Sequence, residues 1–296
     1  MLKAVAFCLV HRIRFVLFSK DACFCRGNGW TDYFEPFCDE VTEDFHSKLN
    51  RRTPEDPTRT AFFLVFLKRK IKRILLGKGC PVSWSIYDSL FRNRLVKIRY
   101  GFNYFTYDLW EDIVHFSPSR NIKVGDLYEG SYYGLIRDLN QLIWRYNRAT
   151  RETVDGLVAG LSLPNYYVAM HIRGGDKVQE ATIVSWEEYV SEAKRIDCKE
   201  WFIFTDDYAV VEKVESITPD HVIKTLCTPQ EHGYYHHSVM TEDSLTMTGK
   251  IIRMFASVDV CKRSGFFIGT RTSNPYYVIE LEHNGKNCLS LDSNWI

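Results

Sequence analysis

The chain has 296 residues, enough for two domains with cores of their own. Its composition, with 45% hydrophobic and 25% charged residues, is that of an ordinary globular protein. A formal net charge of +1 gives no indication of a nucleic-acid-binding surface, so we expect no nucleic acid partner and only a local basic site. The nine cysteines include no paired Cys-x-x-Cys spacing, which disfavours a zinc ribbon. In an oxidising compartment, disulfides stay an open alternative, although the sequence does not tell which cysteines would pair. The candidates are Cys23, Cys25, Cys38, Cys80, Cys227 and Cys288.

The first segments of the chain are short. Residues 4–10 are apolar but too few to span a bilayer, and no cleavage site of small residues follows them. We expect the end of a helix there and then a short strand over 15–18, so that the chain begins in the middle of a βα unit and the N-terminal domain is incomplete. A Gly-Asn-Gly turn follows at 27–29, and the basic stretch at 68–73 predicts a helix with one solvated cationic face.

The second half of the chain has the clearer pattern. An irregular, aromatic-rich region at 100–130 precedes apolar residues at helical spacing, which predict one long helix over 133–161. Strands and helices then alternate, which predicts a doubly wound parallel sheet. We therefore expect an α/β fold with an N-terminal domain at 1–130 and a C-terminal domain at 131–296. The expected strands cover 166–170, 201–204, 221–225 and 265–269, and the expected helices cover 186–196, 209–216, 244–257 and 275–282.

The stretch after the first of these strands carries the most chemically informative residues. It reads His171-Ile-Arg-Gly-Gly-Asp-Lys-Val-Gln-Glu-Ala181. A packed core does not accept such a set of charges, because each buried charge needs a partner, whereas α/β sheets bind ligands at the carboxyl ends of parallel strands. Arg173 and Lys177 supply positive charge for a phosphate-bearing group, and Glu180 is a candidate general base. The alternative is a surface loop of solvated charges.

A second polar group, Thr205-Asp206-Asp207, follows the strand at 201–204. Three roles are open for the two carboxylates: capping the next helix, contacting a polar ligand such as a sugar hydroxyl, or ligating a metal ion. An isolated acidic pair does not make a metal site, so we predict none. A polar region after residue 225 holds three histidines for which surface or acceptor contact is favoured over metal binding: His232, His236 and His237.

A third polar group, Thr270-Arg-Thr-Ser-Asn-Pro275, follows the strand at 265–269. Pro275 suits the first position of a helix, which would make Asn274 its N-cap. Hydroxyl groups and free backbone N–H groups at a helix N-terminus form an anion site that the helix dipole supports. Such residues often only cap a helix, but three polar strand ends on one sheet together favour a ligand site. The pair formed by Ser185 and Glu188, three residues later, predicts a capping box for the helix at 186–196.

With these motifs, segment 166–282 resembles the catalytic domain of the α1,6-fucosyltransferases, which fucosylate the core of N-glycans, and of their bacterial nodulation-factor relatives. The family's first motif is His-x-Arg-Arg-x-Asp-Lys-Val, then Glu-Ala, and a Tyr nine residues after that Glu. This chain has His171-Ile-Arg-Gly-Gly-Asp-Lys-Val178, Glu180-Ala181 and Tyr189. The family's Thr-Asp-Asp is similar to residues 205–207, its Ser-Ser-Gln phosphate loop to Thr272-Ser273-Asn274, and its Gly-Trp-x-x-x-Phe-x-Pro to residues 29–36.

The resemblance implies a GT-B-like pair of Rossmann-like domains and a metal-independent, inverting transfer of fucose from GDP-fucose to an oligosaccharide acceptor such as the GlcNAc of an N-glycan core. No cofactor is implied. Carried over by position, His171 would touch the guanine, Arg173 and Ser273 would hold the diphosphate with Thr272 and Asn274 beside them, and Asp176 and Lys177 would support that site. Glu180 would be the general base, assisted by Lys177 and Arg173 as catalytic cations. Tyr189, Asp206 and Asp207 would contact the acceptor.

Two departures from the family pattern bear on the donor. The family's second arginine is Gly174 here, and the aspartate that reads the base falls at Ser257, with Asp259 two residues later as its substitute. Two alternatives therefore stay open: another nucleotide-sugar donor, and a non-catalytic protein that binds sugar nucleotides. A nucleotide-dependent oxidoreductase fits poorly, since no Gly-x-Gly-x-x-Gly opens a helix after a strand. The resemblance implies location in the Golgi lumen for a eukaryotic member and in the cytoplasm for a bacterial one. It implies membrane attachment only through a segment absent from this chain. A homodimer is compatible with it.

Overall fold

The computed structural model describes residues 1–20, 22, 24–42, 101, 104, 106, 109–118, 121–173, 184–233 and 243–292. The chain divides into two compact units. The first comprises Met1–Asp21 and Phe37–Leu139, and the second comprises Ala22–Pro36 and Asn140–Ile296. The predicted domain boundary between residues 130 and 131 stays a prediction, and the second unit takes in an early segment of the chain.

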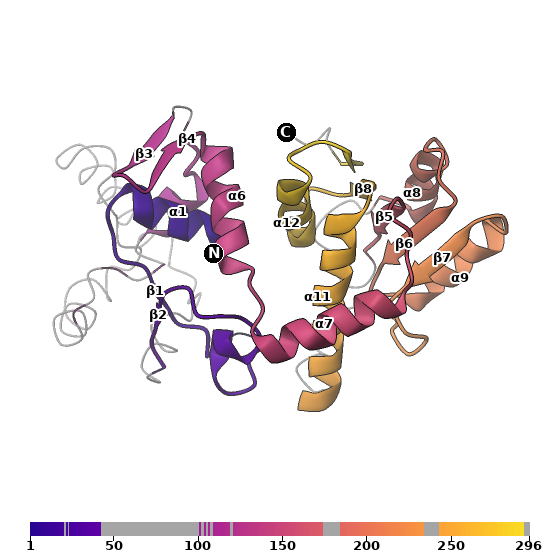
Figure 1. The fold of residues 1–296 in the computed structure, drawn as a ribbon, viewed down its shortest axis with the longest axis horizontal. Coiled ribbons are helices and arrows are strands. Elements are labelled where there is room, and N and C mark those ends of the chain that lie inside the picture. The colour runs from indigo at the N-terminus through magenta and orange to yellow at the C-terminus, as the bar shows by residue number, and fades with distance from the viewer. Residues whose placement is uncertain are drawn as a thin grey trace, which may run out of the picture. The chain divides into compact units, whose positions relative to one another are not determined.

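The second unit is built on a parallel sheet of five strands in the order β7-β6-β5-β8-β9. Figure 1 labels β5, β6, β7 and β8 of this sheet. The chain enters at β5 in the middle, adds β6 and β7 on one side, and then crosses to β8 and β9 on the other. The predicted doubly wound α/β sheet is confirmed. Its strands are β5 (Val168–His171), β6 (Glu200–Phe204), β7 (Val222–Thr225), β8 (Phe266–Gly269) and β9 (Cys288–Ser290).

Helices cover both faces of this sheet, because its central strands bury both faces. On one face, Val168 and Met170 of β5 pack with α8 (Trp186–Ala193) and α9 (Tyr208–Ile217). On the other face, Ala169 packs with α7 (Arg148–Gly160), α11 (Ser244–Arg263) and α12 (Asn274–Glu282). Successive residues of β5 thus point to opposite layers, as the two-residue period of a strand requires.

The prediction of one long helix over 133–161 is wrong. The structure has two helices, α6 (Tyr132–Ile143) and α7, separated by residues 144–147. Asn147 caps α7 by accepting a hydrogen bond of 2.9 Å from the Thr150 N–H, and an asparagine at this position favours a helix start over a helix interior. The apolar spacing that continues on both sides of the break hid it, since Trp144 and Tyr146 are also largely withdrawn from water.

The segment 22–36 joins the second unit through aromatic packing. It contains the short 3-10 helix η1 (Gly29–Asp32), after which the Phe34 ring stacks on Trp30 with centroids 4.1 Å apart. Phe34 also lies 5.5 Å from the Tyr146 ring and 5.1 Å from the Phe255 ring. A polar contact adds to this packing: the Asn147 side chain donates to the Thr31 carbonyl at 3.0 Å.

The first unit has shorter elements. α1 (Leu2–Val10) and β1 (Val16–Leu17) match the predicted helix end and short strand, and β1 pairs in parallel with β2 (Asp39–Glu40). In the region predicted to be irregular, α5 (Trp110–Val114) is followed by a hairpin of β3 (Ile122–Val124) and β4 (Tyr128–Gly130). The cationic helix predicted at 68–73 lies outside the described residues. Among the described helices, none has the length and apolar character needed to cross a bilayer.

The cysteines within the described residues are all free thiols. Cys25, Cys38, Cys227 and Cys288, four of the six that the sequence left open for disulfides, belong to this set. The remaining two, Cys23 and Cys80, lie outside the described part of the chain.

Candidate functional site at the carboxyl edge of the sheet

The strand order reverses between β5 and β8, and this is the point of a doubly wound sheet where ligands bind, beyond the carboxyl ends of the strands. Polar side chains gather at this edge although they are withdrawn from water. They follow or end β5, β6, β8 and β9, and each is at most 8% exposed: His171, Thr205, Thr270, Ser273, Ser290 and Asp292. Because a buried polar group costs free energy unless it is hydrogen-bonded, such a gathering indicates a built site rather than a solvated loop.

His171 and Ser273 join the two sides of the switch point. The Ser273 hydroxyl lies 3.4 Å from the His171 Nδ1 atom, and the imidazole stacks on the Phe204 ring with centroids 4.4 Å apart. Burial, with a smaller contribution from the neighbouring Arg173 charge, lowers the pKa of His171 to about 3. The imidazole is therefore neutral at physiological pH, with one ring nitrogen as donor and the other as acceptor.

The loop after β8 ends at the N-terminus of α12. Ser273, not Asn274, occupies the N-cap of α12, so the predicted cap is wrong by one residue. Asn274 and Pro275 are the first two helical residues, which suits proline because the first N–H groups of a helix have no partner within it. The Ser273 side chain makes no capping hydrogen bond and faces His171 instead. Thr272 precedes it, and its N–H donates to Asp292 at 2.9 Å.

Gly269 lets α12 begin close to the end of β8. A Cβ atom at this position would lie 2.8 Å from the Tyr276 ring and 3.0 Å from the Phe267 ring. Both rings are buried, so neither has room to withdraw. The glycine therefore fixes how near the helix N-terminus comes to the strand ends.

The catalytic residues expected between β5 and α8 are only partly covered by the structure. Arg173 lies two residues beyond β5, half-buried, where its charge acts on His171. Asp176, Lys177 and Glu180 lie outside the described residues, so their roles stay predictions.

The acidic pair after β6 shows at least one structural role. Asp207 is the N-cap of α9 and accepts a hydrogen bond of 3.1 Å from the Ala209 N–H, which agrees with the capping alternative. Asp206 is half-buried, and its carbonyl accepts the Gly233 N–H at 2.7 Å. His232 forms an isolated bridge with Asp207, while His236 and His237 lie outside the described residues. Acceptor contact by Asp206 and Asp207 stays a prediction.

Tyr189 is an interior residue of α8. It is 2% exposed and packs in the core between α8 and the sheet. Burial is the main cause that raises the pKa of its phenol, and its hydroxyl is hydrogen-bonded with Thr270 at the start of the loop after β8. This position makes Tyr189 a support of that loop rather than an exposed surface for an acceptor.

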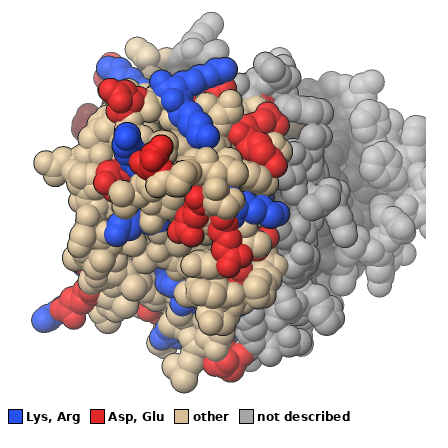
Figure 2. Space-filling model, turned by 90° about the vertical axis from the view of Figure 1, so that its right-hand side faces the viewer, with Lys and Arg blue, Asp and Glu red and all other residues tan. Residues whose placement is uncertain are grey.

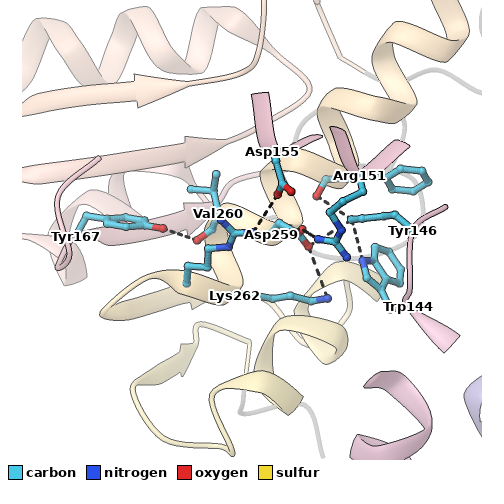
Figure 3. Close-up of polar contacts among 10 residues, drawn as sticks. Trp144, Tyr146, Arg151, Asp155, Tyr167, Asp259, Val260 and Lys262 are labelled. Carbon is cyan, nitrogen blue, oxygen red and sulfur yellow. Dashed lines mark hydrogen bonds and ion pairs between the residues drawn. The ribbon is translucent and has the colours of Figure 1, made fainter. Parts of the chain in front are cut away.

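Asp259 lies at the opposite edge of the sheet from His171. The neighbouring Val260 carbonyl accepts the Tyr167 hydroxyl at 2.7 Å, and Tyr167 directly precedes β5 (Figure 3). His171 is four residues further along that strand, about 13 Å away at 3.3 Å per residue. The structure therefore does not bring Asp259 together with His171 and Ser273, and we do not carry it into the donor site.

Asp259 instead connects α11 to α7. Figure 3 shows its carboxylate facing Tyr146, Arg151 and Lys262. The carboxylate lies 3.3 Å from the Tyr146 hydroxyl, 3.6 Å from the Arg151 guanidinium and 3.9 Å from the Lys262 ammonium. Burial raises the pKa of Asp259 and lowers that of Lys262, so for both partners the loss of water outweighs their mutual attraction. The Lys262 ammonium also lies 4.7 Å from the centroid of the Trp144 ring, a cation–π contact.

Charges on the outer surface of the second unit are mixed in sign. Figure 2 shows Lys and Arg interspersed with Asp and Glu on the face that carries α9. Within the described residues, no group of three or more His, Cys, Asp or Glu side chains is placed to hold a metal ion.

Two site residues, Ser290 and Asp292, escaped the sequence analysis. They belong to β9 and the residues after it, a strand that was not predicted. The alternation Leu289-Ser-Leu-Asp292 is a strand signal. It is only four residues long and follows a helix near the end of the chain, which made it easy to miss.

Comparison with known proteins finds similarity in fold but not in sequence. No protein-family model matches the chain, and no curated protein matches it in sequence. A solved structure of NodZ α1,6-fucosyltransferase soaked with GDP-fucose is similar, with a TM-score of 0.50 and 12% identity over 99% of this chain and 89% of that chain. A NodZ fucosyltransferase from Bradyrhizobium has a TM-score of 0.47 and 12% identity over 95% and 86%, and POFUT1 in complex with GDP-fucose has 0.45 and 11% over 96% and 89%. The chain thus has the α/β fold of GT-B fucosyltransferase structures, as the sequence predicted.

Proposed function

We propose that this protein is an inverting, metal-independent glycosyltransferase that transfers fucose from GDP-fucose to an oligosaccharide acceptor such as the GlcNAc of an N-glycan core. The observation that carries the proposal is the His171–Ser273 junction, because it places buried polar groups and a helix N-terminus at the switch point of a doubly wound sheet. The likeness in fold to a NodZ fucosyltransferase soaked with GDP-fucose supports the choice of donor.

The proposed donor site uses the groups on both sides of the switch point. Arg173 and the Ser273 hydroxyl hold the diphosphate, which the dipole at the start of α12 stabilises, with Thr272 and Asn274 beside it. The neutral His171 has its Nδ1 atom toward the Ser273 hydroxyl and offers its other ring nitrogen to the nucleotide base, as donor or acceptor according to the tautomer. A negative leaving group is thereby stabilised by groups of the protein itself.

The acceptor side of the reaction needs a base. Glu180 takes the proton from the acceptor hydroxyl as that oxygen attacks the anomeric carbon and the bond to the diphosphate breaks. The Lys177 cation stabilises the negative charge that develops on the departing diphosphate, and Asp176 supports the donor site. Asp206 and Asp207 contact hydroxyl groups of the acceptor sugar. In a eukaryote this activity belongs in the Golgi lumen, and in a bacterium in the cytoplasm.

One observation favours a second candidate, a transferase with another nucleotide-sugar donor. The carboxylate that would replace the family's base-reading aspartate, Asp259, is engaged at the amino edge of the sheet by Tyr146, Arg151 and Lys262. A guanine would therefore depend on other groups for its recognition.

Calorimetric titration with GDP, UDP and ADP in the absence of metal tests the proposal. We expect GDP to bind and the other two to bind more weakly. Arg173→Ala removes a charge-assisted contact of about 1.5–3 kcal/mol, so GDP should bind roughly 10–100-fold more weakly. The matched control is Arg195→Ala, since Arg195 is an exposed arginine of the same unit that pairs with Glu192.

Each outcome of the titration has a defined meaning. Preference for UDP would keep the site and replace the donor. Binding of no nucleotide, or equal weakening by the Arg173 and Arg195 variants, would contradict the proposed site. Where GDP binds, Glu180→Gln should abolish fucose transfer and leave GDP affinity nearly unchanged, and an active variant would remove the proposed base.

A further inference from the structure

The carboxylate of Asp292 binds two backbone N–H groups of the loop between β8 and α12. Its Oδ1 atom accepts the Arg271 N–H at 2.7 Å and its Oδ2 atom accepts the Thr272 N–H at 2.9 Å. The Ser290 hydroxyl donates to the same carboxylate at 2.5 Å and also lies 3.1 Å from the Arg271 nitrogen. Asp292 is 8% exposed, so this is a buried, fully hydrogen-bonded anion.

The sheet itself brings Asp292 to this position. β9 pairs with β8 so that Ser290 lies opposite Gly269, and the ladder continues one step further because the Leu291 N–H donates to the Gly269 carbonyl at 2.9 Å. The residue after Leu291 therefore meets the first residues of the loop that leaves β8. A short terminal strand thus sets the geometry of a loop at the switch point.

The loop presents two different faces as a result. The N–H groups of Arg271 and Thr272 point toward Asp292, while the hydroxyl of the next residue, Ser273, points toward His171. Neither a diphosphate nor water can compete for the first two N–H groups without displacing an internal carboxylate. The Ser273 side and the start of α12 remain as the face that serves a ligand.

We propose that Asp292 is a positioning residue of the donor site, which fixes the loop at 270–273 in the conformation that turns the Ser273 hydroxyl toward His171. The inference rests on the proposed function for its ligand, a nucleoside diphosphate sugar, but its geometric part does not. Asp292 touches neither the donor nor the reacting atoms. Three hydrogen bonds stabilise its negative charge, which lies on the face of the loop away from the Ser273 hydroxyl.

The ionisation of Asp292 agrees with this role. Burial raises the pKa of this carboxyl, but the hydrogen bonds from Ser290 and from the N–H groups of Thr272 and Arg271 outweigh burial and leave the pKa below its ordinary value. The group is therefore an acceptor for both N–H groups throughout the neutral pH range.

Two variants at position 292 and one control test the proposal. Asp292→Ala removes both acceptors, whereas Asp292→Asn keeps one acceptor oxygen and replaces the other by a donor. The matched control is Asp32→Asn, because Asp32 accepts N–H groups of Arg26, Gly27 and Asn28 in a loop away from the switch point. Near-ultraviolet circular dichroism selects variants that retain the native fold.

Two readouts are needed, one of which requires no ligand. Hydrogen–deuterium exchange of the peptide covering residues 270–277 reports the loop directly, and calorimetric titration with GDP-fucose reports the donor site. GDP-fucose is preferred to GDP because its diphosphate has no terminal phosphate that titrates near neutral pH. We expect exchange about tenfold faster in Asp292→Ala and an intermediate rate in Asp292→Asn. Affinity for GDP-fucose should fall in the same order, by about tenfold or more for the alanine variant, with Asp32→Asn unchanged.

The outcomes separate this inference from the proposed function. If the parent protein binds no nucleotide, the proposed function fails, and the exchange data still decide whether Asp292 fixes the loop. If the parent binds GDP-fucose and the folded Asp292→Ala variant binds it equally well, the positioning role is overturned. Unchanged exchange at 270–277 in Asp292→Ala would overturn it as well.

Discussion

Replacing Phe34 by alanine should unfold the second unit much more readily, although Phe34 lies more than a hundred residues before the sheet. Its side chain is 3% exposed and meets the rings of Trp30, Tyr146 and Phe255 at 4.1, 5.5 and 5.1 Å. Removal of a buried phenylalanine costs about 3–5 kcal/mol, and the number of rings around Phe34 places it near 4 kcal/mol. Hydrogen exchange of the most protected amides of β5 and β6 should then be roughly 1000-fold faster.

The matched control for Phe34→Ala is Phe37→Ala. Phe37 is three residues away but belongs to the first unit, is half-buried, and stacks on Phe15 with centroids 6.2 Å apart. Exchange in β5 and β6 should change by no more than about threefold in this control. Equal effects of the two substitutions, or a cost below about 1 kcal/mol for Phe34→Ala, would refute the packing of segment 22–36 in the second unit.

Three further predictions concern the stability of the second unit. The pKa of buried His171 is lowered to about 3, so this group favours the folded state fully above its unfolded pKa of about 6.5 and progressively less as pH falls toward 3. Between pH 7 and pH 5 this contribution to the free energy of unfolding falls by about 2 kcal/mol. Urea unfolding of His171→Asn should therefore show a free energy of unfolding that depends less on pH. An unchanged pH dependence would contradict the buried neutral imidazole. Asp259→Ala should cost about 3 kcal/mol in urea unfolding because Lys262, 11% exposed, loses its closest anion. Asp155→Ala, which removes a half-exposed partner of Arg263, should cost less than about 1 kcal/mol, and equal costs would refute the burial argument. Asn147→Ala should cost about 1–2 kcal/mol because it loses both the α7 cap and the hydrogen bond to the Thr31 carbonyl, while Asn147→Asp keeps the cap, loses only that hydrogen bond and should cost about half as much; the same unfolding assay distinguishes them.

The central strands and their polar ends could be predicted because the signals are local. Apolar runs at 166–170, 201–204 and 265–269, each followed by polar residues, contain the information for β5, β6 and β8 within the runs themselves. Parallel pairing then places their carboxyl ends at one edge, so the approach of His171 to Ser273 follows from topology.

Two of the features that escaped prediction depend on partners distant in sequence, and two are local. Asp292 gains its role only because β9 pairs with β8, and Phe34 packs on rings that follow residue 140 as well as on the nearby Trp30. The break before α7 depends on one capping side chain, Asn147, inside an otherwise continuous apolar pattern. The predicted capping box at α8 also failed, because the Ser185 side chain makes no capping hydrogen bond and the Glu188 N–H bonds to the Ser185 carbonyl instead.

The proposed donor site requires a nucleoside diphosphate to bind where β5 and β8 meet. Hydrogen–deuterium exchange with and without saturating GDP tests this location most directly. We expect slower exchange in the peptides covering 168–173 and 270–277, with no change around Val260 and Asp259 at the opposite edge. Protection confined to that opposite edge, or to the first unit, would contradict it.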